Sequence, residues 1–107
     1  MYTEEKKIMM EKTLSEWRTI APVYRAWLLQ YSTCIADDEC SVEYAPFYSN
    51  GVPVKEGWII RKGNTIAGGG SGFGSSHQFP VDTIDEVIKN LQGDIDWMKK
   101  RMEEGYK

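Results

Sequence analysis

The sequence predicts a single α+β domain, in which a helix or helix pair, a three-stranded antiparallel meander and a C-terminal helix follow one another. Three observations support this fold. Apolar residues recur every three or four positions at both ends of the chain, they alternate with polar ones in the middle, and an Asn-Gly pair lies between two alternating runs. A length of 107 residues suits one domain over 1–107. We expect both helices to pack on one face of the sheet.

The N-terminal third has the periodicity of an amphipathic helix. Pro22 falls inside this pattern, and proline removes a backbone hydrogen bond and clashes with the preceding helical turn. One bent helix and a pair of helices, over about 4–19 and 22–32, fit equally well. The apolar stripe, with its members four and three residues apart, consists of Met10, Leu14, Trp17, Ala21, Tyr24, Leu28 and Tyr31.

The middle of the chain changes to a period of two, which indicates strands. The first strand falls within 42–48 and runs into Asn50-Gly51, a pair typical of a type I′ hairpin turn because both positions need positive φ. A second strand is expected over 52–60. A second turn at 62–64 then leads into a short third strand over 65–67.

A final helix is expected from about 83 to 104. Asp82 or Thr83 can cap its start, basic residues at 99–101 suit the negative end of the helix dipole, and Gly105 is a natural stop. Its apolar stripe consists of Ile84, Ile88, Leu91, Ile95, Met98 and Met102.

Between the strands and this helix, residues 68–77 are expected to form a flexible Gly/Ser-rich loop, because 68–76 reads GGGSGFGSS. Glycines let backbone N–H groups converge on an anion, although neither a dinucleotide fingerprint nor a P-loop is present. The loop therefore carries an alternative hypothesis, a small-ligand or nucleotide site. Its residues would be Gly68, Gly69, Gly70, Ser71, Gly72 and His77.

Composition argues against several other functions. The formal charge of −3, from 13 basic and 16 acidic residues, does not favour a nucleic-acid-binding face. No apolar run approaches the length of a membrane span, and the N-terminus lacks a signal peptide, so we expect a cytoplasmic protein with reduced Cys34 and Cys40. These cysteines and His77 are too few and too poorly spaced for a zinc site. We expect no metal and no cofactor.

The leading hypothesis is a non-enzymatic protein–protein interaction module: a regulator, inhibitor or adaptor that also forms homo-oligomers. Catalytic signatures are missing from the sequence, whereas four Trp and six Tyr supply potential anchors for an interface. Small inhibitors carried by mobile genetic elements share this profile. The residues expected to bind a partner are Trp27, Phe73 and Trp97, with Asp37 and Asp38 as a charged contact.

Overall fold

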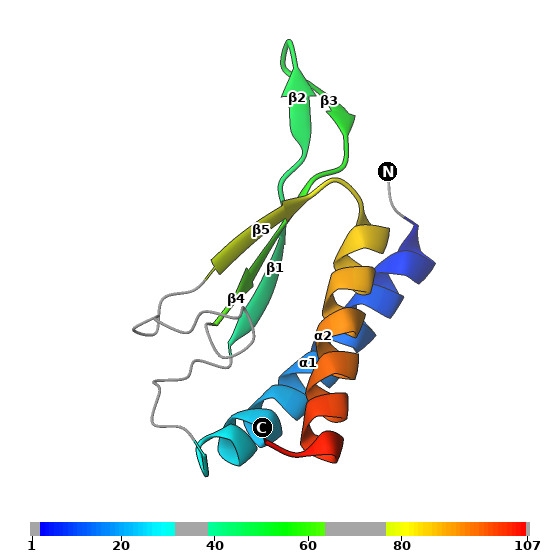
Figure 1. Ribbon diagram of the computed structural model, residues 1–107. Helices are drawn as coiled ribbons and strands as arrows, with labels where there is room; N and C mark the ends of the chain where they lie inside the picture. Colours follow the sequence, from blue (N-terminus) through cyan, green and yellow to red (C-terminus); the bar gives the residue numbers. More distant parts are fainter. Residues whose placement is uncertain (1–2, 32–38, 64–76, 107) are drawn as a thin grey trace.

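Two long helices lie side by side, and a three-stranded antiparallel sheet packs against them (Figure 1). This computed structural model describes residues 3–31, 39–63 and 77–106. The helices are α1 (Glu4–Leu28) and α2 (Ile84–Glu104), and the sheet contains β1 (Cys40–Tyr44), β4 (Trp58–Lys62) and β5 (His77–Val81). The predicted α+β class and the order helix, meander, helix are confirmed.

Helix α1 continues through Pro22, so the single-helix alternative is the correct one. Pro22 is exposed, and the carbonyl that it leaves without a helical partner therefore lies on the solvent side. Thr3 caps the start of the helix by accepting a hydrogen bond from the Lys6 backbone N–H. The core face carries Met10, Thr13, Trp17, Ala21 and Tyr24.

Helix α2 has the boundaries that the sequence predicts. Thr83 is the N-cap and forms a reciprocal capping box with Glu86, while Gly105 ends the helix with a φ of +90°. The two helices are parallel: Lys6 contacts Asp85 near both N-termini, and Trp27 contacts Tyr106 beyond the other end. Both C-terminal ends consequently lie at the same end of the molecule (Figure 1).

The sheet has the order β1-β4-β5, in which Val42, Ile60 and Phe79 are paired across the three strands. The third strand comes later in the sequence than predicted, since β5 begins at His77 and residues 65–67 lie outside the described ranges. The prediction missed β5 because Pro80 interrupts a run of only five residues, which leaves too short an alternating pattern to recognise.

The Asn50-Gly51 turn is confirmed, with φ values of +51° and +80°. It joins β2 (Phe47–Ser49) to β3 (Val52–Lys55), and these form a separate two-stranded sheet instead of extending the main one. We call residues 47–55 the hairpin arm, because they project beyond the rest of the fold (Figure 1).

The two backbone segments of the hairpin approach each other closely where the arm leaves the main sheet. The Ala45 N–H donates to the Gly57 carbonyl over 2.7 Å, and a Cβ at position 57 would overlap the Ala45 carbonyl oxygen and the Phe47 ring. Glycine is therefore required here for close approach of the two chains. Beyond this point a bulge beside Phe47 and Tyr48 changes the register of the arm.

The core lies between the helices and the inner face of the sheet. Its fully buried members from the helices and from β4 include Trp17, Tyr24, Ile60, Leu91 and Ile95. The sheet contributes every second residue of β4, as the period of two requires, and Trp58, Ile60 and Lys62 are all buried.

Candidate protein-binding surfaces

Two groups of apolar side chains, each with several exposed members, lie at opposite ends of the molecule. One is the hairpin arm, and the other is an aromatic cluster at the C-terminal ends of the two helices (Figure 1). We define the aromatic cluster as Tyr24, Trp27, Tyr31, Trp97 and Tyr106.

Ring-to-ring contacts connect the whole aromatic cluster. Tyr31 stacks on Tyr106 with centroids 4.7 Å apart, and Trp27 meets the edge of Tyr31 at 5.5 Å. Tyr24 contacts both Trp27 at 5.7 Å and Trp97 at 5.5 Å. Tyr24 thus connects Trp27 and Trp97, the two tryptophans predicted to bind a partner. From the sequence, Tyr24 was predicted only as a member of the apolar stripe of the N-terminal helix.

The two tryptophans differ in accessibility. Trp97 is 42% exposed, whereas Trp27 is half-buried and packs against the core. Tyr31 and Tyr106 are also exposed, at 51% and 43%. The outer part of the aromatic cluster is therefore Trp97, Tyr31 and Tyr106. Ring pairs in stacked or edge-on geometry stabilise one another beyond the effect of the area that they bury.

Basic side chains accompany the aromatic cluster, as expected at the negative ends of two parallel helix dipoles. The Arg101 guanidinium lies 5.5 Å from the Trp97 ring centroid and 5.7 Å from that of Tyr106. Among the described residues, no carboxylate lies within salt-bridge distance of Arg101, whereas Lys100 approaches Glu104 at 4.0 Å. Arg25 adds another positive charge in the last turn of α1.

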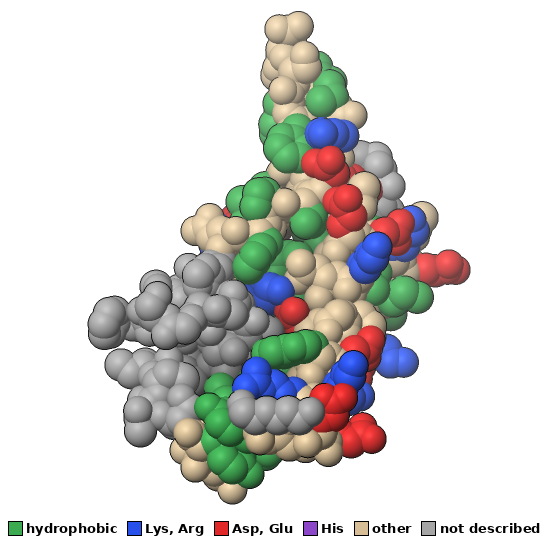
Figure 2. All heavy atoms as spheres, in the orientation of Figure 1, with side chains coloured by type: hydrophobic (Ala, Val, Ile, Leu, Met, Phe, Trp, Pro, Cys, Tyr) green, Lys and Arg blue, Asp and Glu red, His purple; other side chains and the backbone are tan. Residues whose placement is uncertain are grey.

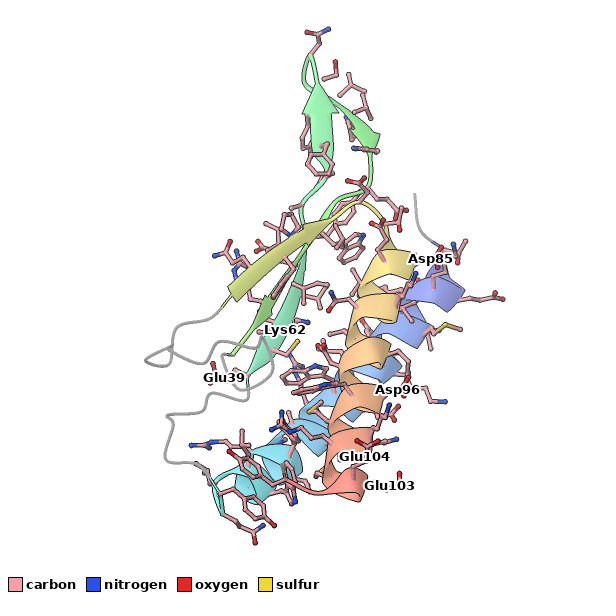
Figure 3. The ribbon with its side chains drawn as sticks, in the orientation of Figure 1. Glu39, Lys62, Asp85, Asp96, Glu103 and Glu104 are labelled. Carbon is pink, nitrogen blue, oxygen red and sulfur yellow. The ribbon has the colours of Figure 1, made fainter. Side chains whose placement is uncertain are left out.

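A shallow depression of about 400 Å³ opens beside these groups. It is lined by Trp97, Lys100, Arg101, Glu104 and Gly105. Figure 3 shows Glu103 and Glu104 at the end of α2, so acidic and basic side chains both lie near this depression. An aromatic face and a guanidinium on its wall suit a ligand that has both an apolar and an anionic part.

The hairpin arm carries four large hydrophobic side chains that are exposed. Phe47 is 42% exposed, and Tyr48, Val52 and Val54 are each about 60% exposed. The segment 47–54 contains no charged residue. On the face shown in Figure 2, the outer part of the arm is hydrophobic or uncharged, and the first charged groups lie at its base. Lys55, the last residue of the arm, has its Nζ 4.8 Å from the Phe47 ring centroid.

The two outer edges of the arm differ. In a two-residue hairpin the closing pair, here Ser49 and Val52, exchanges hydrogen bonds, so the N–H and C=O groups of the next pair point outward. That next pair is Tyr48 and Pro53. Proline has no N–H, so the β3 edge is blocked, whereas the β2 edge can pair with another strand.

A buried polar cluster joins the sheet to the helices. Lys62 extends from β4 toward α2 (Figure 3), and its Nζ donates to Asn90 Oδ1 and Asp94 Oδ2, each over 2.6 Å. Asp94 also accepts from the Trp17 indole N–H at 3.0 Å. Because both hydrogen-bonding partners of Lys62 belong to the fold itself, we assign this cluster a structural role.

The Cys40 thiol is buried beside this cluster. Burial raises the pKa of Cys40 to about 11, although the nearby positive charges of Lys62 and Arg18 oppose the shift. The thiol is therefore protonated at neutral pH, which does not favour a nucleophilic role.

Of the remaining predicted site residues, only the backbone of His77 lies within the described ranges. Phe73, Asp37, Asp38 and the glycine-rich segment 68–72 lie outside the described ranges. The backbone of His77 belongs to β5, opposite Lys62. Within the described ranges, no group of three His, Cys, Asp or Glu side chains is arranged to hold a metal ion. No described helix combines the length and hydropathy needed to cross a membrane.

Comparison with known proteins adds no relatives: no family model matches this sequence, and no curated protein or solved structure matches it. The structure also identifies candidate residues that the sequence analysis did not select. The arm could have been found from its uncharged segment around Asn-Gly. Arg101 and Tyr106 could not, because only the parallel packing of the helices brings the end of α2 to Trp27 and Tyr31.

Proposed function

We propose that this protein is a small, non-enzymatic interaction module, a regulator, inhibitor or adaptor that acts in the cytoplasm and binds other proteins as well as a second copy of itself. The observation that carries the proposal is the hairpin arm, a projection with four large exposed hydrophobic side chains and no charged residue between 47 and 54. Apolar groups gathered on one projection commonly mark an interaction site.

The strand geometry favours self-association through β2. A two-stranded ribbon is marginally stable by itself and gains stability from a third strand. Two copies can pair their β2 edges antiparallel about a two-fold axis, since Tyr48 presents its outward backbone groups and Pro53 blocks the alternative edge. The lack of charge between 47 and 54 means that two arms do not repel each other.

Sedimentation velocity over a range of protein concentrations tests this proposal. We expect the average mass of the wild-type protein to rise with concentration, and the double variant Tyr48→Thr/Val54→Thr to remain monomeric, because threonine preserves strand propensity but removes apolar surface. The matched control is Val23→Thr, which makes a similar change at a residue with 58% exposure on α1. We expect this control to behave as wild type.

The proposed self-association through the arm is wrong if the wild-type protein stays monomeric at every concentration, or if the arm variant associates as strongly as the control. Circular dichroism of the three proteins should superimpose, because all the substituted side chains are largely exposed. If the spectra agree, a lower average mass of the arm variant in sedimentation results from a weakened interface and not from unfolding.

A further inference from the structure

From the aromatic cluster we infer the chemistry of a second binding surface: Arg101, Trp97 and Tyr106 form a docking site for an acidic, apolar peptide segment of a protein partner. The inference rests on the proposed role as an interaction module. It names the ligand class of a surface at the opposite end from the arm (Figure 1).

The guanidinium of Arg101 is positioned by two aromatic rings. It lies near the faces of Trp97 and Tyr106, at 5.5 and 5.7 Å from their centroids, and among the described residues it has no carboxylate partner. A guanidinium has five donors in a planar fork that matches the two oxygens of a carboxylate. Stacking against rings restricts the side chain before binding, which lowers the entropy lost when a ligand binds.

An exposed aromatic ring is available for the apolar part of the ligand. Trp97 is 42% exposed and forms one wall of the depression of about 400 Å³, beside Arg101 and Gly105. Tryptophan and arginine are among the residue types most enriched at the positions that contribute most of the binding energy of protein interfaces. An apolar or aromatic side chain of the partner would cover the Trp97 ring while a neighbouring carboxylate reaches Arg101.

Charge complementarity decides between an acidic and a basic partner. The chain as a whole is acidic, but at the end of the molecule with the aromatic cluster three basic residues face two acidic ones, which are Arg25, Lys100 and Arg101 against Glu103 and Glu104. Glu104, which also lines the depression, lies 4.0 Å from Lys100 and is thereby partly neutralised. Arg101 is left as the positive group beside the exposed ring, so a carboxylate-bearing segment fits better than a basic one.

The test is an NMR titration of the full chain, in which the indole N–H signals of the four tryptophans report on separate positions. The probe is a blocked ten-residue peptide that alternates Asp or Glu with Leu or Phe. We expect it to shift the Trp97 indole signal in a saturable way, while the buried Trp17 signal stays in place. A second peptide, with Asn and Gln in place of the acids, should bind at least several-fold more weakly.

Substitutions then assign the binding to Arg101. We expect Arg101→Gln to weaken peptide binding roughly tenfold, because a charge-assisted bidentate pair is lost. Arg101→Lys should retain only part of the wild-type affinity, because lysine keeps the charge but not the planar fork. Lys89→Gln is the matched control, because it removes the same charge from an exposed site nearer the start of α2. It should leave the affinity within about twofold of wild type, since exposed charges beyond one Debye length are largely screened.

The inference is overturned if the acidic peptide leaves the Trp97 signal unmoved up to millimolar concentration, or if the amide peptide binds equally well. Equal weakening by Lys89→Gln and Arg101→Gln would also overturn it, because binding would then follow net charge and not this site. None of these results affects the self-association of the arm, which sedimentation measures independently.

Discussion

The Nζ atom of Lys62 lies 2.6 Å from Asp94 Oδ2, so an ion pair connects the central strand to α2 beneath the surface of the protein. The Lys62 side chain is 5% exposed and that of Asp94 is 19% exposed. Asn90 accepts a second hydrogen bond from Lys62, and the Trp17 indole donates to Asp94. Thus a single carboxylate holds together residues from α1, α2 and β4.

Removing this carboxylate should therefore be costly. We expect Asp94→Ala to lower the free energy of unfolding by about 2–4 kcal/mol, because it leaves the Lys62 ammonium buried without its counter-ion. The control is Glu43→Ala, which removes the exposed ion pair with Arg61 and should cost less than about 1 kcal/mol. Urea denaturation measures both values. Similar losses for the two variants would show that the Lys62–Asp94 pair is solvated like a surface pair.

The buried thiol predicts a stability change at alkaline pH. The pKa of Cys40 is raised from 9.0 to about 11 on folding, so the unfolded chain loses this proton first as the pH rises. The contribution of the Cys40 thiol to the free energy of unfolding is therefore fully present below pH 9 and is lost as the pH rises from 9 to 11. At pH 10 the loss is about 1 kcal/mol.

The measurement compares Cys34→Ser with Cys34→Ser/Cys40→Ala by urea denaturation at pH 7.5 and pH 10. Both proteins share every other titrating group, so only the difference between them reports on Cys40. We expect any advantage of Cys40 over Ala to shrink at pH 10. A difference that stays constant with pH would contradict the raised pKa.

Gly93 offers a stabilising substitution. It is exposed in the interior of α2, and an added Cβ would meet no atom within 4 Å. Gly93→Ala should increase the free energy of unfolding by about 1 kcal/mol, because alanine has the higher helix propensity. Gly105→Ala is the contrasting variant: its φ of +90° favours glycine, so thermal unfolding should show a lower Tm for this variant and a higher Tm for Gly93→Ala. A lower Tm for Gly93→Ala would contradict the expectation.

The two tryptophans of the aromatic cluster should respond differently to truncation. Trp27→Ala removes a half-buried ring that packs against the core and should cost about 2–4 kcal/mol. Trp97→Ala removes a ring that is 42% exposed and should cost about 1 kcal/mol, while acidic-peptide binding is lost. Denaturation and the NMR titration separate the two effects. Equal destabilisation by both variants would make Trp97 a core residue and not a binding residue.

Short sequence motifs correctly predicted the helix ends and the turn whose conformation depends on a few neighbouring residues. Thr83 and Gly105 bound α2 because capping and positive φ are properties of a few neighbouring residues. Asn50 and Gly51 form the turn for the same reason. The continuation of α1 through Pro22 was left open by the sequence, since it depends on whether that face of the helix meets solvent or the core.

Long-range contacts decided the candidate surfaces. The sequence alone predicted an α+β chain with a capped C-terminal helix, a hairpin turn and two tryptophans as candidate partner-binding residues. Only the tertiary structure showed that the hairpin separates into a projecting arm, and that parallel helices bring Tyr31, Trp97, Arg101 and Tyr106 to the same end. The physical reason is that side-chain periodicity reports which face of an element is buried, whereas the direction in which two elements pack depends on the whole path of the chain between them.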